Sequence, residues 1–214
     1  MKYIQKCKEP SSFTEWKNRR TNKTTLWTKI KQAVKSNLHE TLLHEQGYIC
    51  CYCGASLKGN ESHIEHFKPK SLYTTLTFEY MNLMISCQGE DEEKPRVPVH
   101  CGHKKNNWYE EDLLVSPLIS NCADFFKYPA SGEILPTDDL DKNLAAKETI
   151  EKLALNISKL QDMRRLAIDA ALLATDGLTE AEIQLLAQGY EQLDANGQYT
   201  PFCAAISYFF KNYF

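Results

Sequence analysis

Four cysteines in two separated pairs are the feature that most constrains how this chain can fold. Cys50 and Cys53 form a CxxC turn followed by Gly54, and Cys87 and Cys101 come later, with thirteen residues between them. A tight CxxC turn lets two thiolates reach one tetrahedral ion, and four sulfurs complete a closed structural zinc site. The spacing therefore predicts a structural zinc ion held by these four cysteines.

Two alternatives stay open at this cluster. The second pair is not a CxxC, so His100 could replace either Cys87 or Cys101 as a ligand. The cysteines could also be free buried thiols, because unpaired cysteine packs as a small hydrophobe. That interpretation is kept for the remaining cysteines, which are Cys7, Cys51, Cys122 and Cys203. The N-terminus has no leader-like apolar segment, which predicts a cytoplasmic protein whose thiols bind metal rather than form disulfides.

Charge is distributed unevenly along the chain. The formal net charge is −3, but the first 36 residues carry ten Lys or Arg against two acidic residues. The remainder has 15 basic and 26 acidic residues. We expect the basic arm to contact phosphates and the acidic remainder to meet another protein. No stretch has the roughly 18 apolar residues of a membrane span, so no membrane partner is expected.

The apolar periodicity predicts helices on both sides of a segment without helical period, 48–107. Before it, helices are expected over 13–20 and 24–46, with Gly47 ending the second. After it, residues 125–128 and 133–135 predict a short hairpin. Further helices are expected over 144–175, from a capped turn at 179–182, and from 202 to the end.

A second group of polar residues lies among the cysteines. Glu65-His66-Phe67-x-Pro69 is followed by Asn82-Leu83, and His103 comes after the last cysteine. In this order the chain resembles the HNH endonucleases, over about a quarter of its length. The resemblance implies an α+β, mostly helical fold, in which a zinc-stapled ββα-metal core is embedded between N-terminal and C-terminal helices.

The resemblance also gives each motif residue a role. Hydrolysis of a phosphodiester needs a base for the attacking water and a cation for the phosphate charge. We expect His66 to be the general base, because a neutral histidine suits that task. Glu65 would hold a catalytic Mg²⁺ or Mn²⁺, which prefers carboxylate oxygen. Asn82 would orient the His66 ring or brace its loop.

The second ligand of the catalytic ion is less directly indicated. Many HNH relatives place Asn directly after the final cysteine, where this chain has Gly102. The ligand would then be His103 or Asn106, and His103 is favoured, which would shift the metal preference towards Mn²⁺, Ni²⁺ or Zn²⁺. His63 shares a strand face with Glu65, and its role as a third ligand, a phosphate donor or a structural residue is left open.

Four lysines near the motif are expected to contact the phosphates of nucleic acid, although lysines also commonly form a solvated face. They are Lys68, Lys70, Lys104 and Lys105.

The flanking sequence extends the resemblance. Glu9-Pro10 and Trp16 in the basic start, the Cys-Tyr-Cys-Gly knuckle and the segment 114–118 make the chain similar to the PtuB-type HNH nucleases of Septu and retron-linked antiviral systems. This implies a bacterial effector that acts on DNA, or on RNA such as tRNA. Its expected partners are a PtuA-like ATPase of the SMC or ABC type and, in some systems, a retron reverse transcriptase with its DNA.

We therefore expect a basic helical segment (1–47), a nuclease core (48–137) and a helical region (138–214) whose terminal aromatic residues either dock a partner or pack in the core. The alternative functions are a catalytically inactive, zinc-stabilised module that binds nucleic acid and an adaptor for the ATPase.

Overall fold

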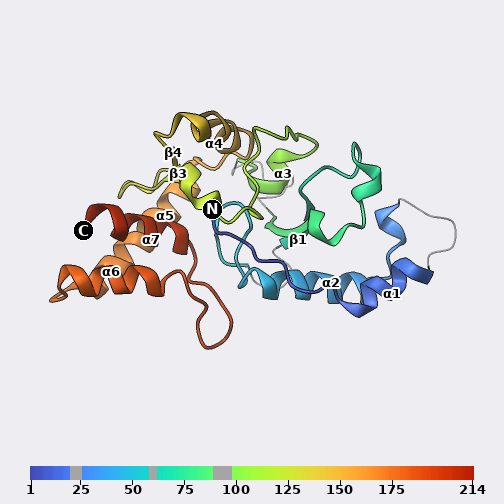
Figure 1. The fold of residues 1–214 in the computed structure, drawn as a ribbon, viewed down its shortest axis with the longest axis horizontal. Helices are drawn as coiled ribbons and strands as arrows, with labels where there is room; N and C mark the ends of the chain where they lie inside the picture. The colour runs from blue at the N-terminus through green and yellow to red at the C-terminus, as the bar shows by residue number, and fades with distance from the viewer. Residues whose placement is uncertain (20–25, 58–61, 89–97) are drawn as a thin grey trace.

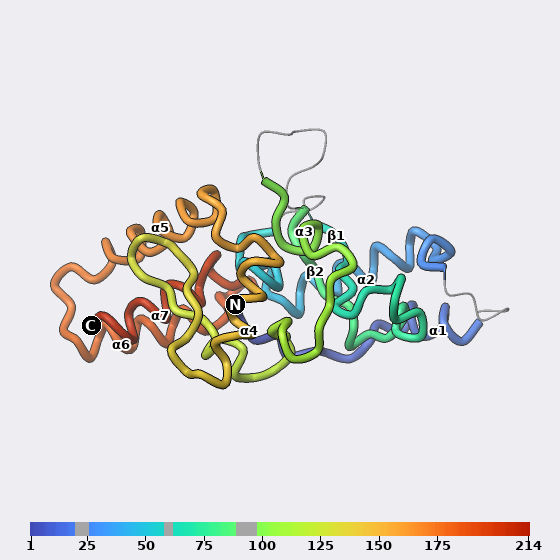
Figure 2. Tube along the Cα trace, turned by 90° about the horizontal axis from the view of Figure 1, so that it is seen from above, coloured from blue at the N-terminus to red at the C-terminus, as the bar shows by residue number. Residues whose placement is uncertain are grey.

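The computed structural model describes residues 1–19, 26–57, 62–88 and 98–214. Figure 1 shows an elongated molecule with α1 (Ser11–Arg19) and α2 (Gln32–Glu45) towards one end and the C-terminal helices at the other. Strand β1 (Ser62–His66) and helix α3 (Cys101–Lys105) lie between them, as the second view confirms (Figure 2). The structure is mostly helical with two small sheets, in agreement with the expected α+β class.

The expected helix over 24–46 is wrong in its first part. Residues 24 and 25 lie outside the described residues, and Trp27–Lys29 form a 3₁₀ turn. Ile30 and Lys31 are then extended before α2 begins at Gln32. The physical reason is tertiary packing, because Ile30 is buried and the Trp27 ring stacks on the Phe78 ring, with centroids 5.9 Å apart.

Strands β1 and β2 (Leu83–Cys87) pair antiparallel at the centre, with Glu65 opposite Met84 and His66 opposite Leu83. The start of β2 is apolar and fully buried, because α2 also packs against this strand. Helix α3 is fixed to β2 by a hydrogen bond from the Gly102 amide to Ser86 Oγ, 3.1 Å. Two strands and one short helix therefore form a unit from segments separated in the sequence.

The expected hairpin is confirmed, since β3 (Phe126–Lys127) pairs with β4 (Leu135–Pro136). Its turn contains Gly132, which has a φ of +80°. A Cβ there would lie 2.1 Å from the carbonyl oxygen of Gln161, so the turn accepts only glycine. The buried Arg164 donates from Nε to the Gly132 carbonyl at 2.6 Å and so ties the hairpin to the C-terminal helices.

The C-terminal region contains α4 (Leu140–Lys152), α5 (Ser158–Leu172), α6 (Glu180–Gly189) and α7 (Cys203–Tyr213). The single helix expected over 144–175 is wrong, because the chain turns at Ala154, whose φ is +49°. Leu153 and Leu155 are buried on either side of it, and the Leu153 carbonyl accepts from the Cys101 amide at 2.8 Å. This contact with the start of α3 stabilises the break.

The remaining C-terminal expectations are largely confirmed. Thr179 and Glu182 form a capping box at the start of α6. In α7, Phe209 and Phe210 pack into the core, whereas Tyr213 and Phe214 are exposed. No helix within the described ranges combines the length and the apolar character that crossing a membrane requires.

Candidate functional site

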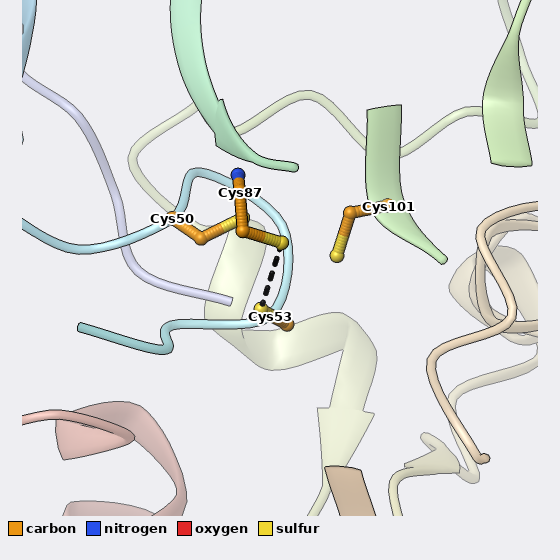
Figure 3. A group of neighbouring side chains, drawn as sticks. All are labelled: Cys50, Cys53, Cys87 and Cys101. Carbon is orange, nitrogen blue, oxygen red and sulfur yellow. Dashed lines mark hydrogen bonds between the residues drawn. The ribbon is translucent and has the colours of Figure 1, made fainter. Parts of the chain in front are cut away.

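The four predicted zinc ligands come together in the structure. Cys50 and Cys53 lie on the turn after α2, Cys87 ends β2, and Cys101 begins α3. Their sulfur atoms all lie within 4.8 Å of one another, and Figure 3 shows the side chains gathering from these separate segments. The Sγ atoms of Cys53 and Cys87 are 3.9 Å apart. A tetrahedral zinc with bonds of about 2.3 Å would separate its sulfurs by roughly 3.8 Å, so the cluster fits this ion.

The electrostatics of the cluster also favour a cation. Burial raises the pKa of the Cys101 thiol, so this residue becomes a thiolate only where a cation offsets that cost. His100 is buried beside the cluster, with Nδ1 3.1 Å from Cys101 Sγ and 3.7 Å from Cys87 Sγ. His100 therefore contacts the sulfurs of Cys87 and Cys101 but is not part of the group of four clustered ligands. Of the other cysteines, Cys51, Cys122 and Cys203 are buried as expected, and Cys7 is exposed.

A cavity of about 480 Å³ lies between β1 and α3 and collects most of the predicted catalytic residues. Its walls include His66, Glu65, Lys70, His103 and Asn106. Glu65 and His66 belong to β1, His103 belongs to α3, and Lys70 and Asn106 follow these two elements. The β1–β2 pairing and the cysteine cluster hold β1 and α3 against each other. A substrate phosphate and a hydrated divalent ion are small enough for this space.

His66 is buried at the cavity wall with a defined ring orientation. Its Nε2 lies 3.1 Å from the Thr77 carbonyl oxygen. A carbonyl only accepts hydrogen bonds, so Nε2 carries the proton and Nδ1 keeps the basic lone pair. Burial, helped by the positive charge of Lys70, lowers the pKa of His66 to about 4. The ring is therefore neutral at pH 7, the form that a general base requires.

Trp27 is a component of this site that the sequence analysis did not identify. Its ring meets the His66 ring edge-on, with centroids 4.5 Å apart and planes at 80°. In the sequence, Trp27 falls within the helix expected over 24–46, and nothing there relates it to the site. Thirty-eight residues lie between Trp27 and His66 in the sequence, and no local pattern relates them.

Asn82 braces the loop that follows β1, one of its two expected roles. Its Oδ1 accepts from the Lys68 amide at 2.7 Å, and its Nδ2 donates to the Lys68 carbonyl at 3.0 Å and to the Leu76 carbonyl at 3.2 Å. These bonds fix the chain directly after His66. Asn82 therefore supports the His66 backbone rather than the ring.

Glu65 is buried and its two carboxylate oxygens have different partners. Oε1 lies 2.8 Å from Lys105 Nζ and accepts from the Tyr52 hydroxyl at 3.2 Å. Oε2 lies 3.4 Å from His63 Nε2. Burial raises the pKa of Glu65, but the hydrogen bond with His63 and the charge of Lys105 together outweigh it and lower the pKa. Glu65 is therefore a carboxylate with a fixed orientation.

The four lysines have different surroundings. Lys70 and Lys104 are exposed, and Lys70 lines the cavity. Lys68 binds Glu111 at 3.2 Å and lies 5.0 Å from the Tyr109 ring centroid. The expected phosphate contact is not what the structure shows for Lys105, which is buried and donates to the His66 carbonyl at 3.0 Å besides pairing with Glu65. A buried ammonium needs such partners, so Lys105 is an internal counter-ion.

The candidates for the second metal ligand lie at the edge of the cavity. His103 is exposed, and its ring stacks on that of His63 with centroids 4.5 Å apart and planes at 26°. Asn106 ends α3 with a φ of +49°. Among the described residues, four cysteines make the one group of three or more His, Cys, Asp or Glu whose ligand atoms lie within 4.8 Å of one another. His103 thus does not join Glu65 and His63 in such a group.

The basic arm is less available to phosphates than expected. Lys6 is buried in an ion pair with Glu45 and donates to the Leu83 carbonyl at 2.8 Å. Lys17 pairs with Glu9 at 2.6 Å. The Lys6 ammonium links the first segment to α2 and β2, whereas Lys17 forms its ion pair within that segment. The charge of the arm is therefore partly neutralised by the protein itself.

No protein-family model matches this chain. A protein of Vibrio cholerae serotype O1 biovar El Tor, named as the inferred HNH endonuclease of retron Vc95, is 32% identical over 145 residues. The aligned region covers 65% of this chain and 65% of that relative. The similarity supports the resemblance to HNH endonucleases and to their retron-associated members.

Proposed function

We propose, from the premise that this chain is related to the HNH endonucleases, that it hydrolyses phosphodiester bonds of nucleic acid with a divalent metal ion. The observation that carries the proposal is the meeting of His66 and Glu65 at one cavity, where the ring has a basic Nδ1 and the carboxylate is ionised. The similarity to an HNH endonuclease supports it independently.

In this proposal His66 is the general base. Its Nδ1 accepts the proton of the attacking water, while the Thr77 carbonyl holds Nε2–H and so fixes both tautomer and ring position. Burial and the charge of Lys70 keep His66 neutral. The edge contact with the Trp27 ring limits its rotation. Asn82 maintains the loop that follows.

The divalent ion, Mg²⁺ or Mn²⁺, supplies positive charge against the phosphate and the leaving oxygen when it is bound. Glu65 would hold it, oriented through Oε1 by Lys105 and Tyr52. The sequence motif would make His103 or Asn106 a second ligand of this ion. Lys68, Lys70 and Lys104 would contact flanking phosphates, and screening by salt should weaken their contribution.

A structural zinc is proposed for the Cys50, Cys53, Cys87 and Cys101 cluster. The separation of 3.9 Å between the sulfurs of Cys53 and Cys87 supports this ion. Bound there, zinc would tie the turn after α2 to β2 and α3, and thereby maintain the cavity between β1 and α3.

The biological setting is a further part of the proposal. The relative's name supports an association with a retron. We further propose a role in antiviral defence, with DNA favoured as substrate and RNA such as tRNA as the alternative. The expected partners are a PtuA-like ATPase and a retron reverse transcriptase with its DNA. Residues 1–47, 48–137 and 138–214 are proposed as the basic segment, the nuclease core and the partner-docking region.

The test is cleavage of labelled plasmid DNA, single-stranded DNA and total tRNA with Mg²⁺, Mn²⁺ or Ni²⁺, with and without the ATPase partner. Metal-dependent products in at least one lane support the nuclease and identify its substrate. Salt-sensitive binding without products in any lane would favour the inactive binding module, and partner binding without nucleic-acid affinity would favour the adaptor.

A further inference from the structure

The site has a histidine to which neither the motif nor the proposed reaction gives a function. We propose that His63, on β1, ligates the catalytic divalent ion together with Glu65, in place of a ligand at position 102. This inference rests on the proposed function and specifies how the ion is held. It departs from the sequence expectation, which favoured His103.

The distance between His63 and Glu65 suits two ligands of one ion. The residues are two apart on a strand and therefore share a face. His63 Nε2 and Glu65 Oε2 are 3.4 Å apart. Adjacent ligands of an octahedral ion with bonds of about 2.1 Å are separated by roughly 3 Å. Binding an ion between these two atoms would need only a small movement of either side chain.

Gly102 makes this approach possible. A Cβ at this position would lie 2.7 Å from Glu65 Oε2 and 2.8 Å from His63 Nε2, closer than real Cβ contacts allow. A glycine within a helix is less favourable than an alanine. Here it leaves room for the His63 imidazole beside the carboxylate. The imidazole from β1 thus stands where α3 would otherwise present a side chain.

One nitrogen of His63 has a protein partner and the other has none. Its Nδ1 is buried and has no hydrogen-bond partner among the residues that the structure describes. With the proton on Nε2, the ring donates to Glu65 Oε2, which holds it beside the carboxylate. With the proton on Nδ1, the Nε2 lone pair faces the carboxylate, and a cation between Nε2 and Oε2 replaces that repulsion by coordination.

His103 fits a supporting role better than a ligand role. It is exposed, whereas the side chain of His63 is only 24% exposed. The stacked contact between the two rings, with centroids 4.5 Å apart, restrains the His63 plane. His103 is therefore a positioning residue for the His63 ring.

The experiment uses the full chain with its zinc and takes Mn²⁺ as the probe. Calorimetry measures the Mn²⁺ affinity, and electron spin-echo spectroscopy detects ¹⁴N coupling from an imidazole bound to Mn²⁺. We expect ¹⁴N coupling in the wild type and in His103→Gln, and its loss in His63→Gln with an affinity at least roughly tenfold lower. Zinc content and thermal unfolding of each variant verify the fold.

Two results would overturn the inference. One is coupling that survives in His63→Gln and disappears in His103→Gln, and the other is a wild type that binds Mn²⁺ without ¹⁴N coupling. Cleavage distinguishes these failures from a failure of the proposed function. If wild type cleaves and Glu65→Gln loses Mn²⁺ while His63→Gln keeps full affinity, only the assignment of His63 is wrong. If no metal supports cleavage, the nuclease proposal fails as well.

Discussion

The Lys105 ammonium lies 2.8 Å from the Glu65 carboxylate, and both side chains are buried, at 1% and 8% exposure. The pair joins α3 to β1, and Glu65 also lines the cavity. Lys105 also donates to the His66 carbonyl, so one side chain contacts both residues of the Glu-His motif. Lys105 therefore orients the motif and does not contact the substrate.

Removing this internal counter-ion should destabilise the protein. Lys105→Met leaves Glu65 buried without its cation, which should lower the free energy of unfolding by about 3 kcal/mol or more. Lys104→Met is the matched control, because Lys104 is adjacent and exposed, and it should change stability by less than about 0.5 kcal/mol. Urea unfolding of both variants measures the difference. Equal effects of the two substitutions would refute the internal role of Lys105.

Trp27 should be needed for the reaction without contacting substrate phosphate. Trp27→Leu removes the edge contact with the His66 ring, so the ring should lose its fixed position. Small misplacement of a catalytic group is costly, and we expect the cleavage rate to fall by roughly tenfold to a hundredfold. Leu26→Ala is the control, since Leu26 is 56% exposed, and it should keep the wild-type rate. A Trp27→Leu variant with an unchanged rate would show that the contact is incidental.

The cysteine cluster should retain zinc through purification without chelator. Elemental analysis is expected to give one zinc per chain in the wild type and in Cys203→Ser, whose sulfur lies outside the cluster. Cys53→Ser should lose the ion and unfold at a lower temperature, because binding of structural zinc is coupled to folding. A wild-type protein that is fully folded and free of zinc would contradict the assignment.

A side chain at Gly102 should disturb the metal site specifically. Gly102→Ala would place a Cβ within 3 Å of both Glu65 Oε2 and His63 Nε2, so the affinity for Mn²⁺ should fall by roughly tenfold or more. Gly189→Ala, in α6, is the control because its Cβ would meet no atom of the described residues within 4 Å. That variant should bind Mn²⁺ as the wild type does. Calorimetry measures the Mn²⁺ affinity of both variants. Equal affinities would show that a side chain at position 102 does not disturb the metal site.

The parts of the site predictable from sequence are those with short-range patterns. Cys50 and Cys53 are three residues apart, and Glu65 and His66 are adjacent, so local spacing already indicates a cysteine knuckle and a Glu-His motif. The capping box at Thr179 is equally local. In each case the chemistry depends on neighbours within one turn or one strand.

The parts of the fold and the site that could not be predicted from the sequence depend on contacts between distant segments. In the sequence, Lys105 resembles a phosphate-binding lysine beside the motif. Only its position under β1, where it pairs with Glu65, makes it a counter-ion. The break at Ala154 follows from the bond between Leu153 and Cys101, which no periodicity reveals. Gly102 was interpreted as the loss of a ligand, whereas its surroundings indicate space for His63.

The most direct test of the central claim is the rate of Mg²⁺- or Mn²⁺-dependent cleavage by His66→Ala beside His44→Ala. His44 is an exposed histidine of α2, so it controls for the general loss of an imidazole. We predict that His66→Ala is folded, retains zinc and cleaves about a hundredfold to ten-thousandfold more slowly, while His44→Ala retains the wild-type rate. A folded His66→Ala variant that cleaves at the wild-type rate would contradict the account.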